Sequence, residues 1–314
     1  MKKLLWLISI AAILAVLTAC GAENNEETSA EEKEEKETVT IEHELGETEV
    51  PVNPENAVVF DYGILDSLDY LGIDVAGVSK TALPDYLAHY DSDDYENIGS
   101  LKEPDFEKIA EIDPDVIIIS ARQASLYDQL SEIAPTIHLG VDPTRYMDSF
   151  KENMNKLGKI YGKTEEIEEA VTEIEDSIAE LTEKTQGMEE EGLIILANDD
   201  KMSAYGPSSR FGLIHDVFGV PASDEGIEAS THGMNISPEY VMEQDPDLLY
   251  VVDRAAVVGG DTSAQQLVEN ELTKNTKAYQ KDQIYYLSPD YWYLSGGGLV
   301  SVKEMVNEIK ASLE

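Results

Sequence analysis

Short apolar runs and helix-spaced apolar positions alternate along the first part of the chain. Residues 57–60 form an apolar run, residues 64–71 repeat apolar side chains with helical spacing, and residues 75–78 form a second apolar run. This order of strand, helix and strand predicts parallel strands joined by helical crossovers. Residues 39–52 precede it and alternate polar and apolar side chains about a glycine, which predicts a pair of strands.

Helical periodicity dominates residues 146–188, with one interruption near residues 158–163. Strand patterns resume at residues 193–197. The chain is therefore predicted to be an α/β protein of two Rossmann-like lobes, which one long connector helix joins and a ligand cleft separates. We expect the N-terminal lobe at residues 39–145, the connector at residues 146–188 and the C-terminal lobe at residues 189–314.

An internal repeat supports two similar lobes. Residues 107–122 and residues 239–254 each begin with glutamate, contain Asp-Pro-Asp followed by an apolar run, and end with arginine. Each copy is predicted to be a short helix, then a buried strand, then an arginine just past the carboxyl end of the strand. Because ligands of open α/β sheets bind beyond that end, Arg122 and Arg254 are candidate ligand-binding residues.

The first residues have the pattern of an export signal. Two lysines precede an apolar run at residues 4–17, and a segment of small residues ends at Cys20. The run is shorter than the ~17 to 25 residues of a membrane-spanning helix. The acidic sequence that follows contains no large apolar side chain, so it predicts a flexible tether. We expect a signal peptide at residues 1–19 and the tether at residues 20–38.

The composition excludes several classes of function. Among the 314 residues, 64 are Asp or Glu and 22 are Lys or Arg, so the formal net charge is −42. Such a charge repels phosphate backbones, and nucleic-acid binding is not expected. The single cysteine allows neither a disulfide framework nor a cysteine-based zinc or iron-sulfur site within one chain.

Four further motifs stand out in the sequence: Ile119-Ser-Ala-Arg122-Gln, Tyr205-Gly-Pro-Ser-Ser-Arg210-Phe-Gly, Val251-Val-Asp-Arg254 and Tyr291-Trp-Tyr293-Leu-Ser-Gly-Gly-Gly298. As an exported, two-lobed chain with a helical connector, the protein resembles the substrate-binding lipoproteins of ABC importers for iron-siderophores, haem and cobalamin, over residues 39–314. Through these four motifs it is most similar, within that group, to the catecholate-siderophore binders of the petrobactin type. The segment that ends at Cys20 resembles a lipobox. This implies a lipidated Cys20 as the mature N-terminus and an anchor at the extracellular face of the cell membrane.

The chain has four arginines: Arg122, Arg145, Arg210 and Arg254. For Arg145 we expect an ordinary ion pair with a surface carboxylate. For the other three, which lie in strand-end or Gly-Pro turn settings, we expect a positive pocket that binds a ferric-catecholate anion. Guanidinium groups suit this role because they donate in a planar fork to oxygen acceptors.

Two further side chains are candidate iron ligands through the resemblance. His232 lies in a glycine-containing loop before the helix of the second repeat, and Tyr293 lies in the Tyr-Trp-Tyr motif. A phenolate oxygen is a hard ligand that suits Fe(III). Tyr291 remains an alternative to Tyr293, and Trp292 is expected to point the opposite way along a strand or to pack. The other four histidines are expected to be structural or solvated.

The resemblance also implies partners for the chain. Glu107 and Glu239 occupy equivalent positions in the repeat and match the two glutamates that dock onto arginines of an ABC permease dimer, which works with its ATPase. Taken alone, each would be a solvated charge near the start of a helix. We expect a monomer with no permanently bound cofactor and a Fe(III)-siderophore as its ligand.

Other functions fit the sequence less well. An exported enzyme would use the same cleft, but the chain contains no Gly-x-Gly-x-x-Gly after a strand, no Walker loop, no His-Glu-x-x-His and no Gly-x-Ser-x-Gly. A zinc or manganese receptor needs several His and carboxylate ligands, whereas the five histidines here are scattered. Haem and cobalamin receptors share the expected fold but do not explain three arginines. We therefore predict a binding protein and not an enzyme.

Overall fold

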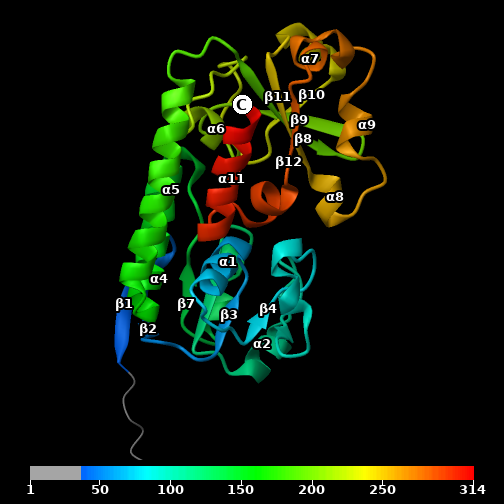
Figure 1. Cartoon of the computed structure of the whole chain (residues 1–314). Helices are drawn as coiled ribbons and strands as arrows, with labels where there is room; N and C mark the ends of the chain where they lie inside the picture. Colours follow the sequence, from blue (N-terminus) through cyan, green and yellow to red (C-terminus); the bar gives the residue numbers. More distant parts are fainter. Residues whose placement is uncertain (1–36) are drawn as a thin grey trace, which may run out of the picture. The chain divides into compact units, whose positions relative to one another are not determined.

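The computed structural model describes residues 37–314 (Figure 1). Its first sheet has five parallel strands in the order β5-β4-β3-β6-β7. The strands of this sheet are β3 (Ala57–Val59), β4 (Gly77–Val78), β5 (Glu96–Asn97), β6 (Val116–Ile119) and β7 (Thr136–His138). The predicted alternation of strands and helical crossovers is thus confirmed.

The first sheet is joined by short helices and preceded by a hairpin. The helical elements are α1 (Tyr62–Tyr70), a 3-10 helix (Asp85–Asp91), α2 (Phe106–Ile112), a 3-10 turn (Ala124–Leu126) and α3 (Tyr127–Ser131). The hairpin pairs β1 (Thr38–His43) with β2 (Gly46–Pro51) in antiparallel register, as the alternating pattern predicts. Among residues 37–314, no helix is long and apolar enough to cross a membrane.

The connector consists of two consecutive helices instead of one continuous helix. A 3-10 turn (Pro143–Arg145) leads into α4 (Tyr146–Tyr161), and α5 (Thr164–Thr185) follows. Gly162 separates them with a φ of 63°, a left-handed conformation that ends α4 and that glycine adopts at little cost. The interruption that the sequence predicts near residues 158–163 is therefore a glycine cap.

The second sheet has five strands in the order β10-β9-β8-β11-β12. They are β8 (Gly192–Asn198), β9 (Lys201–Tyr205), β10 (Met234–Ile236), β11 (Leu248–Asp253) and β12 (Ile284–Leu287). β8, β11 and β12 are parallel, whereas β9 and β10 are antiparallel to their neighbours. The antiparallel edge arises because the turn at Asp199 (φ 53°) folds β9 directly back on β8.

Short helices join the strands of the second sheet, and a long helix ends the chain. They are α6 (Leu213–Asp216), α7 (Pro238–Gln244), α8 (Arg254–Val258), α9 (Ala264–Val268), a 3-10 turn (Thr273–Asn275), α10 (Lys277–Gln280), a π-helical turn (Asp290–Ser295) and α11 (Leu299–Ser312). The α/β fold with helices around two sheets agrees with the predicted fold class.

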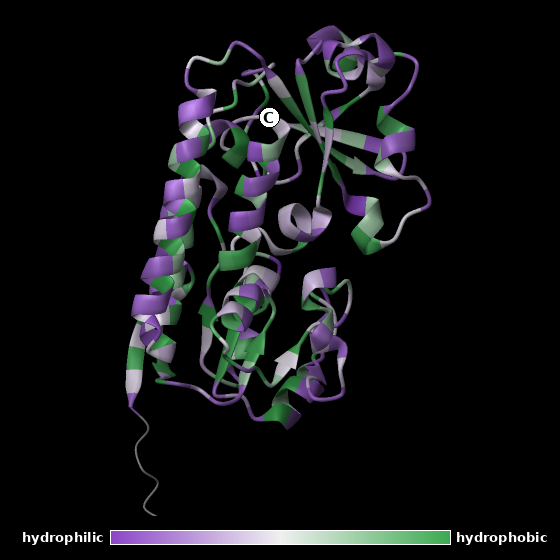
Figure 2. Cartoon of the chain, viewed as in Figure 1, coloured by the Kyte–Doolittle hydropathy of each residue, from purple (hydrophilic) through white to green (hydrophobic). Residues whose placement is uncertain are grey.

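The apolar core connects the two sheets through helices. Apolar side chains concentrate in the strands of both sheets, whereas α5 and α11 carry apolar and polar stripes (Figure 2). One buried cluster includes residues of both sheets and of α1, α4, α5 and α11. Its members include Leu65 of α1 and Val302 of α11, both fully buried. The last helix packs against α1 near the first sheet, against α5 of the connector and against the π-helical turn.

The Asp-Pro-Asp repeat is a helix-ending device. Asp113 and Asp245 adopt left-handed backbone conformations at the ends of α2 and α7. The proline that follows each of them cannot continue a helix. Both repeats therefore end a short helix and lead directly into a buried strand, as the sequence predicts.

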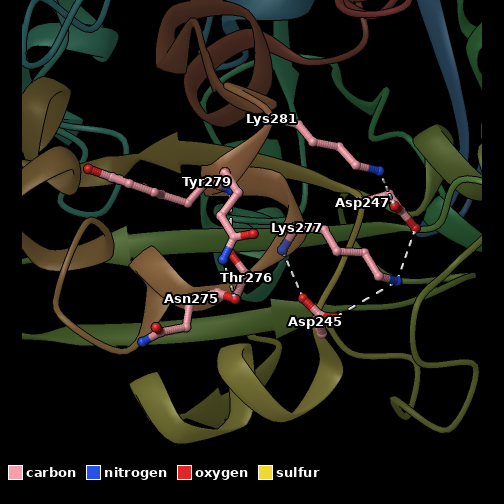
Figure 3. A network of polar contacts seen from close by, with 8 residues as sticks. Asp245, Asp247, Asn275, Thr276, Lys277, Tyr279 and Lys281 are labelled. Carbon is pink, nitrogen blue, oxygen red and sulfur yellow. Dashed lines mark hydrogen bonds and ion pairs between the residues drawn. The ribbon is translucent and has the colours of Figure 1, made fainter.

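The second copy of this device is reinforced by two lysines (Figure 3). Asp245 accepts a hydrogen bond from the backbone N–H of Lys277 at 2.8 Å. Asp247 accepts from the Lys281 Nζ at 3.0 Å and from the Lys277 Nζ at 3.5 Å. These contacts attach α10 to the start of β11, so this copy of the motif has a structural role in the second sheet.

A buried carboxylate links α1 to the start of α11. Asp66 is fully buried and accepts hydrogen bonds from the backbone N–H of Ser301 at 3.0 Å and of Val300 at 3.3 Å. The phenol of Tyr86 donates to it at 3.0 Å. Burial raises the pKa of Asp66 to about 7, although these donors favour the charged form. A negative charge at this place also favours the positive end of the 14-residue α11.

Two glycines permit this close approach. A Cβ on Gly298 would lie 1.9 Å from Asp66 Oδ1, and a Cβ on Gly63 would lie 2.5 Å from the carbonyl of Ser295. α1 therefore contacts the backbone just before α11 directly. Figure 1 shows α11 beside both α1 and α5.

We predict that Asp66→Ala lowers the free energy of unfolding by about 3 kcal/mol or more, because it leaves the backbone N–H groups of Val300 and Ser301 without a buried acceptor. Denaturant unfolding of the purified protein measures this loss. Asp148→Ala, which removes an exposed acid in the first turn of α4, is the matched control and should cost less than about 1 kcal/mol. Equal losses in the two variants would contradict a specific role for Asp66.

Candidate functional site

Two of the three candidate arginines follow parallel strands. Arg122 lies in the turn after β6, and Arg254 is the first residue of α8, directly after β11. Asp253 caps α8 by accepting a hydrogen bond from the N–H of Ala256, which fixes where the helix begins. Both arginines thus lie beyond the carboxyl ends of their strands, as the repeat predicts.

Arg210 is held by the turn that follows β9. The Ser209 hydroxyl donates to the carbonyl of Gly206 at 2.5 Å, and the N–H of Arg210 donates to the carbonyl of Ser230 at 3.3 Å. A Cβ on Gly206 would lie 2.9 Å from the side chain of Ile227. The Gly-Pro turn is therefore needed for close packing, and it projects Arg210 from the end of the strand.

Tyr293 lies in the π-helical turn and not in a strand. The strand that we expected around Trp292 is wrong, because residues 290–295 wind into one wide turn that ends at Gly296. Trp292 is buried, and its Nε1 donates to Glu308 of α11 at 2.6 Å. The alternative expectation, that Trp292 packs, is confirmed. Single turns of π-helix are frequent at functional sites.

The three arginines converge on Tyr293. Arg210 Nη2 donates to the backbone carbonyl of Tyr293 at 2.7 Å, and Arg122 Nη2 donates to the same oxygen at 3.4 Å. Arg254 Nε donates to the phenol oxygen at 2.7 Å. The guanidinium carbon of Arg210 lies 4.3 Å from the centre of the Tyr293 ring. One tyrosine is thus contacted by three cations from three separate segments of the chain.

None of these three arginines pairs with a carboxylate within residues 37–314. Their partners are Tyr293 and the side-chain oxygen of Asn198, which accepts from Arg254 Nη1 at 2.6 Å. Arg145, by contrast, forms an exposed ion pair with Glu152, as the sequence predicts. In a chain of charge −42, three arginines without acidic partners form a local positive site.

This arrangement changes the acidity of the tyrosine. Burial of Tyr293 opposes ionisation, but the hydrogen bond from Arg254 and the charges of Arg210, Arg254 and Arg122 outweigh it, so the pKa of Tyr293 lies below 10. Burial lowers the pKa of Arg210, and the charge of Arg122 lowers it further. The site therefore favours a negative charge on the phenol and on any bound group.

A pocket of about 370 Å³ opens beside these residues. Its walls come entirely from the part of the chain after β8 begins. The lining residues that carry polar side chains are Asn198, Lys201, Ser203, Tyr205, Arg210, Thr231, His232, Asn235, Arg254 and Tyr293. His232 and Tyr293 share this pocket, whereas Arg122 reaches its edge from the first sheet through the Tyr293 carbonyl.

Several pocket residues were not among the predicted site residues. Lys201 and Ser203 alternate along β9 with Met202 and Ala204, which are buried in the core, and Tyr205 at the end of the strand lines the pocket but is itself buried. The period of two over residues 201–204 was a usable signal, since polar residues at alternate positions mark the less buried face of a strand. The sequence did not reveal that β9 folds back on β8, so it did not show that Lys201 and Ser203 lie beside the pocket.

The other candidate residues lie elsewhere. The Tyr291 ring packs 5.0 Å from the ring of Tyr86, centre to centre. Glu107 and Glu239 are exposed in the first turns of α2 and α7. Cys20 and the predicted signal peptide lie outside the described residues. No group of three or more metal-ligating His, Cys, Asp or Glu side chains occurs within the part of the chain that the structure describes.

The remaining histidines have local roles. Burial lowers the pKa of His43 to about 4, and it also lowers the pKa of His138 and of His215. His215 Nδ1 lies 2.8 Å from the carbonyl of Val220, and His89 pairs with Asp69 at 2.9 Å. The structure thus places none of these four among the residues that line the pocket.

Comparison with known proteins identifies the family and the fold. A family model for periplasmic binding proteins matches residues 58–291. The chain is 47% identical to the petrobactin-binding protein YclQ of Bacillus subtilis, over 100% of both chains. It is also 27% identical to YhfQ of the same organism, a putative ABC transporter substrate-binding lipoprotein, over 94% of this chain and 93% of that one.

Solved structures give the same picture. The crystal structure of YclQ matches 89% of this chain and 99% of its own, with a TM-score of 0.86 and 49% identity. The periplasmic catecholate-siderophore binding protein VctP of Vibrio cholerae matches 88% of this chain and 100% of its own, with a TM-score of 0.83 and 37% identity.

We predict that Tyr293 ionises below pH 10, and that Arg254→Met raises its pKa because the variant removes a hydrogen bond and a positive charge that stabilise the phenolate. The tyrosinate absorbance of the wild-type protein minus that of Tyr293→Phe, followed against pH, isolates this group. The same difference taken in the Arg254→Met background should shift to higher pH. An unshifted titration would show that Arg254 does not act on the phenol.

Proposed function

Because the chain belongs to the periplasmic binding protein family, we propose that it captures a ferric catecholate siderophore of the petrobactin type and delivers it to an ABC importer for iron uptake. The observation that carries this proposal is the set of three arginines without acidic partners around Tyr293. The similarity to a petrobactin-binding protein and to a catecholate-siderophore binder supports it. The chain is a binding protein, and no chemical step is assigned to the pocket.

The charge of the proposed ligand fits the site. Fe(III) bound by two doubly deprotonated catechols forms an anion whose oxygens are acceptors without protons. Arg122, Arg210 and Arg254 supply forked donors to such oxygens, and charge-assisted bonds of this kind are about twice as strong as neutral ones. Partly burying three cations without acidic partners is costly. An anionic ligand that accepts their hydrogen bonds would offset this cost.

We further propose that His232 and Tyr293 complete the coordination of iron when the siderophore supplies only four oxygens. Fe(III) prefers six ligands, so two positions then remain. A neutral imidazole and a phenolate are suitable ligands, and metal binding removes the phenol proton more readily when its pKa is already lowered. Both side chains line the same pocket, which supports the pairing.

We predict that replacing any one of Arg122, Arg210 or Arg254 by Ala weakens binding of a ferric bis-catecholate about thirtyfold or more, since breaking a buried charge-assisted contact costs roughly 2 to 5 kcal/mol. Quenching of intrinsic fluorescence measures the affinity. Arg145→Ala changes the net charge equally but removes only an exposed ion pair, so its affinity should equal that of the wild type. The proposal fails if all four variants bind alike.

The proposed role of His232 and Tyr293 as iron ligands is tested by varying the number of oxygens with which the siderophore binds iron. His232→Ala and Tyr293→Phe should weaken a tetradentate ferric bis-catecholate strongly, because water replaces the lost ligand. They should barely affect a hexadentate tris-catecholate, whose six oxygens already saturate the iron. The loss of a phenolate-to-iron absorption band in Tyr293→Phe is the spectroscopic check. Equal small losses for both ligands would mean that neither side chain contacts the metal.

We also propose how the protein is placed in the cell and passes on its cargo. A lipid on Cys20 would anchor the monomer at the extracellular face of the cell membrane, and residues 20–38 would tether the folded part. Glu107 and Glu239 would dock onto the permease dimer that works with an ATPase. Their equivalent places in the first turns of α2 and α7, one beside each sheet, support docking of both lobes at once. The proposed lobes remain residues 39–145 and 189–314, with the connector at residues 146–188.

We predict that reversing Glu107 and Glu239 together to Lys abolishes iron-siderophore uptake by cells while ligand affinity in solution stays unchanged, because both side chains are exposed and outside the pocket. Exposed acids on another helix, Glu168 and Glu169 of α5, provide a double reversal with the same charge change. Uptake at the wild-type rate in the Glu107 and Glu239 variant would rule out the docking role.

A further inference from the structure

One wall of the pocket carries polar side chains that the proposed iron site does not use. Lys201 and Ser203 lie on the pocket face of β9. In the sheet register Lys201 pairs with Asn198 of β8, and Ser203 pairs with Asn235 of β10. Paired residues lie on the same face of a sheet. Three adjacent strands therefore present one continuous polar patch to the pocket, consisting of these four residues.

Lys201 is a cation without an acidic partner. Its side chain forms no ion pair within residues 37–314, although Asp199 and Asp200 precede it in the turn. Asp199 instead accepts the backbone N–H groups of Asp261 and Thr262. Most other lysines in the same described part pair with carboxylates on the surface. Because Lys201 lines the pocket and its charge has no acidic partner, it adds to the positive charge of the pocket.

The polar patch adjoins the arginine cluster through Asn198, which contacts Arg254. Arg254 donates to the phenol of Tyr293 with Nε and to Asn198 with Nη1, so its guanidinium spans from the proposed iron ligand to the polar wall. Lys201 lies next to Asn198 in the strand register. A ligand group that reaches Lys201 is thus separated from the iron-binding oxygens by the Arg254 layer. With the catechol oxygens on the arginines, such a group would come from the part of the siderophore that links the catechols.

We propose that Lys201, Ser203 and Asn235 form a subsite for a carboxylate carried by the linker of the siderophore. This inference rests on the proposed function and adds the charge of the linker as a determinant of specificity. The ammonium, hydroxyl and amide groups all donate hydrogen bonds, and a carboxylate accepts several of them at once. A linker without an acidic group would leave Lys201 with water as its partner.

Two ferric complexes that differ only in this carboxylate test the subsite. The iron complex of N2,N6-bis(2,3-dihydroxybenzoyl)-lysine carries it, whereas that of bis(2,3-dihydroxybenzoyl)-1,5-diaminopentane lacks it. Lys201→Met should weaken the first complex about five- to tenfold relative to the second, and Lys201→Arg should retain most of the affinity. Lys159→Met, an exposed lysine of α4 outside the pocket, is the control with the same change in net charge.

The possible outcomes distinguish failure of the proposed siderophore binding from failure of the carboxylate subsite alone. Wild-type protein that binds neither ferric complex contradicts the proposed function and the subsite with it. Tight binding of both complexes, with equal losses or none in Lys201→Met, leaves the proposed function standing and overturns the subsite. A loss confined to the carboxylate-bearing complex, absent in Lys159→Met, supports the subsite.

Discussion

The contact of three arginines with one tyrosine is the constraint on which the functional part of the structure depends. Arg122, Arg210 and Arg254 come from segments far apart in the sequence, and each donates to Tyr293. Like charges this close repel one another. Hydrogen bonds to Tyr293 and Asn198 and the contact of Arg210 with the Tyr293 ring offset this repulsion, whereas no carboxylate within residues 37–314 forms an ion pair with the three arginines. The positive charge of the cluster is therefore available to an anion. Because the rest of the chain is acidic, an anionic ligand is favoured at this cluster over the rest of the surface.

The framework that holds Tyr293 is itself fixed from both sides. The π-helical turn is attached to α11 through Trp292 and Glu308, and α11 begins on the buried carboxylate of Asp66 in α1. The position of Tyr293 thus depends on contacts that lead to the first lobe, through residues that do not line the pocket. Fixing the tyrosine in this way keeps the arginine donors preorganised for a ligand.

Much of this could be predicted from the sequence because the signals were local. The repeat located Arg122 and Arg254 at strand ends, and helical periodicity located the connector and its interruption. The scarcity of arginine in an acidic chain singled out the three members of the site. Two features depended on tertiary contacts and were missed. The turn at Tyr293 places Trp292 against α11, and Lys201 and Ser203 border the pocket because β9 folds back on β8.

Selection by ligand charge tests the central claim most directly. Fluorescence titration of the purified protein with an anionic ferric bis-catecholate and with a neutral ferric tris-hydroxamate, at several salt concentrations, compares two iron complexes that differ in charge and donor type. The account predicts that the anionic complex binds at least about a hundredfold more tightly, since even ~3 kcal/mol from the arginines is enough for that ratio. It also predicts that salt narrows the difference. Equal or tighter binding of the neutral complex would contradict the account.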